Sequence, residues 1–165
     1  MMDIEIERLQ TQLRRMLEGE AWHGPSVLEA LQDVTPELAY SHPVAGAHSI
    51  WEIVLHLAST YRLVLRRIHG NDQPLSPEED WPAVPPPTAS NWQDAVRSLR
   101  QLNEELRQAL RTFSPDRLDE PLVVTPPYTA YTQFIGITQH DAYHAGQIAV
   151  LKKALQSTSN PPGPA

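Results

Sequence analysis

Apolar residues recur every three or four positions along four long stretches of the chain, which is the spacing of one face of an α-helix. These stretches coincide with four runs that contain no proline, at residues 1–24, 44–73, 88–114 and 128–160. All 16 prolines lie between or beyond the runs, as expected for helices, because proline lacks a backbone N–H and clashes with the preceding turn. No segment shows the two-residue alternation of a β-strand. The pattern therefore predicts an all-α fold, a four-helix bundle.

Each run carries one apolar stripe that can face a common core. In the first run the stripe ends near Gly19 and a shorter helical segment begins at Pro25, so this helix is expected to be bent or broken. The stripes comprise, in order, Ile6, Leu9, Leu13, Met16 and Leu17; Ile50, Ile53, Val54, Leu57, Tyr61, Val64 and Ile68; Trp92, Ala95, Val96, Leu99, Leu102, Leu106, Leu110 and Phe113; and Phe134, Ile137, His144, Ile148, Leu151 and Leu155.

Residues typical of helix ends lie at the borders of these runs. Ser49 and Glu52 have the spacing of a capping box, in which each side chain accepts a hydrogen bond from the backbone of the other residue. Gly70 is the expected residue just beyond the C-terminus of the same helix. Ser90 and Gln93 repeat the capping-box spacing and predict the start of the third helix.

The second and third helices are joined by a long segment, residues 71–89, with six prolines and a solitary Trp81. Loops of this length are uncommon within a compact domain. This segment is either a passive crossover between helices that are not antiparallel neighbours or a wall over a pocket. We predict a single domain over residues 1–156 and a disordered tail over residues 157–165, where small polar residues and proline have little to bury.

Composition and charge exclude several classes of protein. Thirteen Lys and Arg against 20 Asp and Glu give a net charge of −7, so nothing in the charge favours nucleic acid or an anionic membrane as a partner. The chain begins without a basic, apolar leader and has no apolar stretch long enough to cross a bilayer, so a cytoplasmic location is expected. Because there is no cysteine, any thiol chemistry requires a thiol from outside the chain.

Two histidines in the last helix have the spacing of metal ligands. His140 and His144 lie four residues apart, so both imidazoles occupy one helix face and can reach a common ion. His144 lies near the middle of the apolar stripe and His140 toward its edge, so both can point into the bundle. The residue after the first histidine is Asp141 instead of glutamate, which disfavours a zincin-type protease. The simpler alternative is a pair of hydrogen-bonded core histidines.

A third ligand would have to come from another helix. His56 is the best candidate because it lies on the inner side of the second helix, and His48 is the second choice. Glu52 could also bind a metal, but the capping box already accounts for it. Three imidazoles would leave coordination positions open, as in catalytic sites. The remaining histidines lie in or beside turns and are expected to be solvated: His23, His42 and His69.

In four segments the sequence resembles the DinB and YfiT-like family of candidate metalloenzymes. The resemblance spans most of the chain and rests on Ala21-Trp22-His23-Gly24-Pro25-Ser26, Ala47-His48-Ser49-Ile50-Trp51-Glu52 through His56-Leu57, Asp80-Trp81-Pro82, and Gly136 through His140-Asp141-Ala142-Tyr143-His144-Ala145-Gly146-Gln147-Ile148. It implies a four-helix bundle with a long crossover after the second helix and a metal site formed by His56, His140 and His144. Members of this family are associated with zinc, nickel and other divalent metals. Some transfer a low-molecular-weight thiol, such as bacillithiol or mycothiol.

The leading hypothesis is a metal-dependent enzyme that transfers a low-molecular-weight thiol to a small electrophile. The ion would bind the thiol, lower its pKa and deliver it as a nucleophile. Asp141, Gln147 and Tyr143 are candidates to accept the second N–H of a ligating imidazole, and Gln147 is favoured by its position one turn below His144. The expected partner is a small-molecule substrate.

Two alternatives remain at the level of the sequence. The first is a metal-dependent hydrolase that uses metal-bound water, although the sequence offers no evident general base. The second is a noncatalytic, stress-associated metal-binding homodimer in which the ion fastens the second helix to the fourth. Trp22, Trp51 and Trp92 are candidates for its subunit interface.

Overall fold

The structure, a computed structural model, describes residues 3–125 and 128–159. Four long helices dominate it: α1 (Ile4–Glu18), α4 (Ile50–Ile68), α6 (Ala89–Arg111) and α7 (Ala130–Ser159). Within the described ranges there is no β-strand, and the one β-type pairing is an isolated bridge between Pro121 and Thr129. The all-α prediction is therefore confirmed, and each long helix falls within one of the four proline-free runs.

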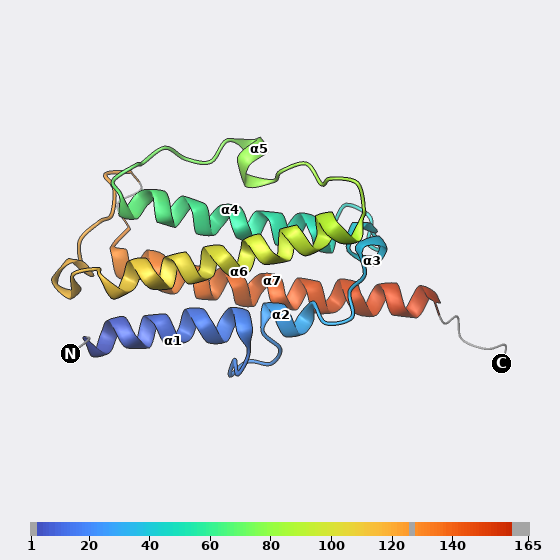
Figure 1. The fold of residues 1–165 in the computed structure, drawn as a ribbon, viewed down its shortest axis with the longest axis horizontal. Coiled ribbons are helices and arrows are strands. Elements are labelled where there is room, and N and C mark those ends of the chain that lie inside the picture. Colours follow the sequence, from blue (N-terminus) through green and yellow to red (C-terminus); the bar gives the residue numbers. More distant parts are fainter. Residues whose placement is uncertain (1–2, 126–127, 160–165) are drawn as a thin grey trace.

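The four long helices pack in a ring, because α1 and α4 each contact both α6 and α7. Figure 1 shows that α4 and α6 run in the same direction, whereas α1 and α7 run in the opposite one. Two helices that are consecutive and parallel need a connection as long as the helices themselves. The crossover between them contains the short helix α5 (Pro77–Asp80) and returns along the outer side of α4 (Figure 1).

Short helices fill the other connections. The predicted break after the first helix is present: α1 ends at Glu18, and α2 (Val27–Ala30) and α3 (Pro36–Tyr40) precede α4. A single 3₁₀ turn, Pro115–Arg117, follows α6. Helix α2 packs against α1 and α7, and α3 packs against α4.

Two of the three predicted helix ends are confirmed and one is wrong. Ser49 and Glu52 form a capping box at the start of α4, and Gly70 follows its C-terminus with a φ of 80°, which favours glycine. The predicted box of Ser90 and Gln93 is not formed. Helix α6 begins two residues earlier, because the Thr88 hydroxyl accepts the N–H of Asn91 and proline precedes Thr88.

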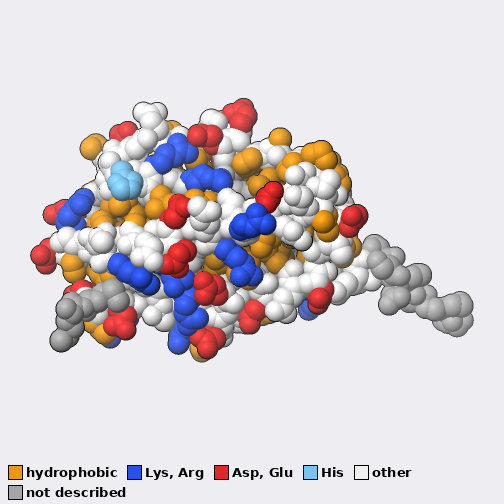
Figure 2. All heavy atoms as spheres, in the orientation of Figure 1, with side chains coloured by type: hydrophobic (Ala, Val, Ile, Leu, Met, Phe, Trp, Pro, Cys, Tyr) orange, Lys and Arg blue, Asp and Glu red, His pale blue; other side chains and the backbone are white. Residues whose placement is uncertain are grey.

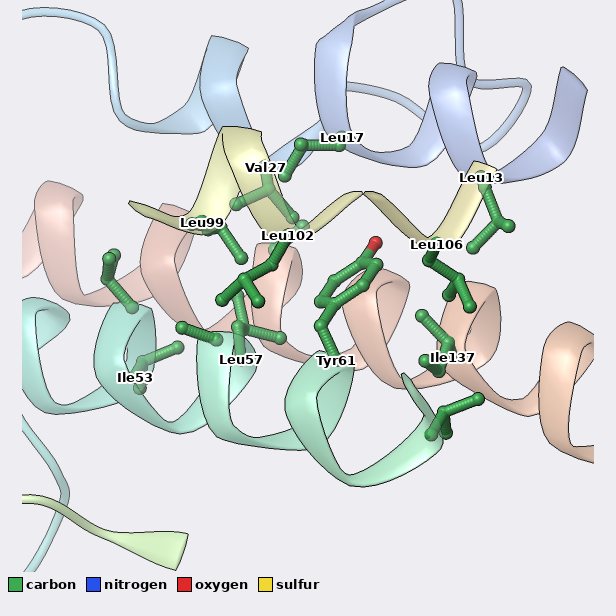
Figure 3. Close-up of a cluster of buried hydrophobic side chains, with 14 of the residues drawn as sticks. Leu13, Leu17, Val27, Ile53, Leu57, Tyr61, Leu99, Leu102, Leu106 and Ile137 are labelled. Atoms are coloured by element: carbon green, nitrogen blue, oxygen red, sulfur yellow. The ribbon is translucent and has the colours of Figure 1, made fainter. Parts of the chain in front are cut away.

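The predicted apolar stripes meet in one core. Figure 3 shows side chains from α1, α2, α4, α6 and α7 interdigitating around Tyr61, whose hydroxyl is the polar atom of this cluster. The structure does not place Trp51 and Trp92 at the surface, as a subunit interface would require. Both are buried, with ring centroids 5.1 Å apart in an edge-to-face arrangement. Trp22 is fully exposed, and the homodimer stays a prediction.

The surface and the C-terminal end bear on three further predictions. Acidic and basic side chains are interspersed over the face in Figure 2, without a continuous basic patch on that face. None of the described helices is long and apolar enough to span a bilayer. Helix α7 continues to Ser159, so residues 157–159, the start of the predicted disordered tail, are helical, and residues 160–165 lie outside the described residues.

Candidate metal centre

The packing of α4 on α7 brings three histidines together. His56 lies in the second turn of α4, and His140 and His144 occupy successive turns in the middle of α7. All three project between the two helices: His56 and His144 are buried, and His140 is half-buried. One ligand atom from each lies within 4.8 Å of the other two, an arrangement that could hold a metal ion.

The nitrogens of this histidine cluster are spaced like ligands of one ion. His140 Nε2 is 3.0 Å from His56 Nε2 and 3.1 Å from His144 Nε2. Two nitrogens that are each about 2.1 Å from an ion, and about 90–110° apart around it, are separated by about 3.0–3.4 Å. The observed separations therefore match imidazoles that share an ion of this size.

Two of the imidazole rings have hydrogen-bond partners at Nδ1, and these partners orient the Nε2 lone pairs of the rings into the cluster. His144 Nδ1 donates to Gln147 Oε1 at 2.6 Å. His56 Nδ1 faces two oxygens of Asp80, the main-chain carbonyl at 3.0 Å and Oδ1 at 3.1 Å. A neutral imidazole that donates from Nδ1 has a bare lone pair on Nε2. The Nε2 lone pairs of His56 and His144 thus both face His140 Nε2. His140 Nε2 carries at most one proton and can donate a hydrogen bond to one of them. A cation, in contrast, can bind all three nitrogens.

Two histidines of the cluster, His140 and His144, are held in the form that binds metal. Burial, followed by the proximity of His144 and His56, lowers the pKa of His140 to about 4. Burial also lowers the pKa of His144, against the opposing effect of its hydrogen bond to Gln147. Both rings are therefore neutral at neutral pH, as coordination requires. His140 Nδ1 is buried without a hydrogen-bond partner among the described residues.

The crossover covers the cluster. The Trp81 indole stacks on His56, with ring centroids 4.0 Å apart and an interplanar angle of 2°. His48 stacks on the other face of the same indole at 3.5 Å. Together with the contact of Asp80 to His56 Nδ1, this stacking favours the interpretation of the crossover as a wall over a site rather than a passive connection.

Of the three candidates for orienting a ligand, Gln147 is the one that hydrogen-bonds to a histidine of the cluster. Asp141 lies on the core side of α7 and accepts the Tyr61 hydroxyl at 2.6 Å. Burial raises the pKa of Asp141 to about 7, although the bond from Tyr61 opposes the shift. Tyr143 is exposed, and its ring packs edge-on against His144.

Asp80 is a functional candidate that the sequence analysis did not assign. It lies 24 residues beyond His56, at the end of the one-turn helix α5, in a crossover where no hydrophobic period predicts which side chains meet. Its position beside Trp81 in one of the four resembling segments was the available signal. Among the other histidines, His48 lies outside the cluster, and His42 is not merely solvated as expected, because its Nε2 is 3.0 Å from Glu52 Oε2.

Two cavities flank the histidine cluster. The larger has a volume of about 660 Å³, and its walls include His48, Ile53, Tyr143, Gly146, Gln147 and Val150. It reaches the cluster through Gln147, the partner of His144. The smaller has a volume of about 300 Å³ and lies between α4 and α7 on the other side, with His140 in its wall. A bound ion would therefore have space for small molecules on both sides.

Comparison with curated proteins finds no match to this chain, and comparison with solved structures finds none either. Residues 21–148, in contrast, match the sequence profile of the DinB superfamily. The matched region begins before α2 and ends within α7, so it contains the whole histidine cluster and the crossover that covers it. The chain belongs to the DinB superfamily.

Proposed function

We propose that this protein is a metal-dependent enzyme in which His56, His140 and His144 hold one divalent transition metal ion, such as zinc or nickel. The observation that supports this most strongly is the convergence of three Nε2 atoms at separations of 3.0 and 3.1 Å, two of them with Nδ1 engaged elsewhere. Three protein ligands leave at least one coordination position open, which is typical of catalytic sites.

The reaction that we propose is transfer of a low-molecular-weight thiol, such as bacillithiol, to a small electrophile. A divalent ion supplies Lewis acidity that lowers the pKa of a thiol bound to it. The thiolate sulfur attacks an electrophilic carbon, so that a C–S bond forms and either a leaving group departs or an epoxide opens, with its oxygen taking the proton. The chain has no cysteine, so the thiol is a second substrate.

The residues around the cluster would each contribute to this reaction. Gln147 and Asp80 hold the rings of His144 and His56 in the orientation that points their lone pairs at the ion. Trp81 excludes water from the face of His56. We assign the electrophile to the larger cavity, where Ile53 and Val150 favour an apolar molecule.

The test is a screen of thiols and divalent metals against epoxides and activated halides, with the His140→Ala protein as control. We expect a rate that requires both metal and thiol and that the control lacks. Metal-dependent hydrolysis of an ester, amide or lactone, with no thiol reaction, would support the hydrolase instead. If neither class reacts and the ion exchanges only when the protein unfolds, the noncatalytic metal-binding protein replaces both.

A further inference from the structure

The smaller cavity has a polar end that the proposed reaction has not used. This cavity, the Arg67 groove, lies between α4 and α7, and its walls include Thr60, Val64 and Arg67 from α4 and Gln133, Gly136 and His140 from α7. His140 closes the end nearest the histidine cluster. Arg67 lies at the other end, where its Nη1 donates to Gln133 Oε1 at 2.9 Å.

Arg67 is half-buried and has no carboxylate within salt-bridge distance among the described residues. Its Nε is buried without a hydrogen-bond partner. What distinguishes Arg67 is the missing carboxylate: Arg66 pairs with Glu79, and Arg107, whose Nε is likewise buried without a partner, pairs through Nη1 with Glu18 and Glu104. Burial lowers the pKa of Arg67, against the opposing effect of Tyr128. A half-buried guanidinium with an unused N–H and no carboxylate beside it favours an anion as its missing partner.

Gly136 keeps the groove open. It lies inside α7, where glycine destabilises a helix relative to alanine. A Cβ atom at this position would meet nothing within 4 Å, so no close contact with the rest of the protein requires glycine here. The space that a side chain would occupy instead belongs to the groove.

We propose that the Arg67 groove binds the carboxylate of an elongated small acid, with the guanidinium donating to the carboxylate and the rest of the molecule running toward the histidine cluster. Gln133, which holds Arg67, precedes His140 by seven residues, or about 10 Å along the helix. An acid bound to Arg67 can therefore extend over up to about this length toward His140. This inference rests on the proposed function only for the group at the end of the acid that lies near the histidine cluster. Because the electrophile is assigned to the apolar cavity, that group is the thiol, and the acid is the thiol substrate.

Binding can be measured without metal and without turnover. Hexanoate is titrated into metal-free protein and followed by NMR at the side-chain amide of Gln133, which lines the groove and is present in every variant, with hexanamide as the uncharged match. We expect hexanoate to bind at least about tenfold more tightly than hexanamide. Arg67→Gln should remove this difference, and Arg67→Lys should restore part of it. Arg66→Gln is the control and should change nothing, because Arg66 pairs with Glu79 outside the groove.

Blocking the groove provides a second, independent variant. Gly136→Leu should abolish hexanoate binding, whereas Gly146→Leu, which fills the larger cavity instead, should leave it unchanged. Circular dichroism verifies that each variant is folded. Equal binding of hexanoate and hexanamide, or binding that survives both Arg67→Gln and Gly136→Leu, would overturn the inference whether or not the protein is an enzyme.

Metal-loaded protein then shows whether the carboxylate belongs to the thiol or to the electrophile. Thiols of increasing chain length are compared, each with a terminal carboxylate or a terminal hydroxyl, against one neutral electrophile. We expect KM to be lowest for a carboxylate thiol that spans from the cluster to Arg67, and this preference to be lost in Arg67→Gln. If only a carboxylate on the electrophile lowers KM, the thiol assignment is wrong. If a carboxylate lowers KM on neither the thiol nor the electrophile, the groove has no role in the reaction. Carboxylate binding by the metal-free protein is tested separately, by the NMR titration.

Discussion

The two oriented histidines are held by acceptors of different kinds. His144 depends on the side-chain amide of Gln147, whereas His56 faces both the main-chain carbonyl and the carboxylate of Asp80. A side-chain acceptor disappears when its residue is replaced, but a carbonyl remains. The two positions should therefore respond differently to substitution.

Replacing Gln147 with leucine should weaken metal binding about 10- to 100-fold, the usual effect of losing the hydrogen bond that orients a ligating histidine. Asp80→Ala should have a smaller effect, because the carbonyl of residue 80 still accepts the His56 N–H. Competition with a chromophoric chelator measures both affinities. Equal losses in the two variants would show that the carbonyl contributes nothing.

The buried Asp141 should make the stability of the metal-free protein depend on pH. Its pKa is raised from 3.8 to about 7, so the unfolded chain ionises first and stability is lost as pH rises through this interval. A tenfold difference in acidity between the folded and unfolded states corresponds to about 1.4 kcal/mol. Asp141→Asn should thus remove about 2 kcal/mol of the decline in unfolding free energy between about pH 5 and about pH 7. Denaturant unfolding measures this, and an unchanged decline in the variant would contradict the assignment.

At the scale of elements, the crossover is the part that joins the fold to the site. The parallel direction of α4 and α6 requires a long connection, and this connection lays Trp81 over His56. The indole is held on both faces, by His48 and by His56. The crossover should therefore control how readily an ion leaves.

Trp81→Ala should speed removal of the ion by a chelator at least several-fold, because the substitution exposes the face of His56 to water. Helical content should be unchanged, since Trp81 lies outside the long helices. Trp22→Ala is the matched control, because Trp22 is fully exposed and remote in sequence from the cluster. Identical removal rates for the two variants, measured by stopped-flow absorbance, would exclude a covering role for Trp81.

The elements that the sequence predicts well are those with a local signal. The stripe from Ile50 to Ile68 has the helical period, and the pairing of His140 with His144 follows from one turn of a single helix. The partners that depend on tertiary contacts are different. Asp80 meets His56 across the crossover, and the Nε1 of Trp92 donates to the carbonyl of Val34, 58 residues earlier in the chain. Neither contact has a periodic signal in the sequence.

At the scale of the whole molecule, the core does not depend on the histidine cluster. Residues buried among all four long helices, such as Leu13, Leu57, Leu99 and Phe134, supply apolar packing without a metal. We therefore expect His144→Ala to lose stoichiometric metal while keeping most of its helical content. Elemental analysis and circular dichroism test this. Unfolding together with metal loss would favour a structural ion, whose binding energy is folding energy.

Metal occupancy should fall toward acid, because protons and the ion compete for the same nitrogens. Burial lowers the pKa of His140 to about 4 and lowers that of His144 as well, so the ion should be retained below pH 6.5, the ordinary pKa of histidine. Activity should fall over the same range. Equilibrium dialysis across pH measures the occupancy, and a loss centred above the ordinary pKa of histidine would contradict the burial of the cluster.

The central claim is that three imidazoles hold one ion and leave a position for substrate. X-ray absorption spectroscopy of zinc-loaded protein, with and without a small thiol, tests it most directly. We expect one ion per chain bound by three histidine nitrogens, with a sulfur ligand that appears only when thiol is added. We also expect no such spectrum for His144→Ala. A first coordination sphere filled by four protein ligands and unchanged by thiol would contradict the claim.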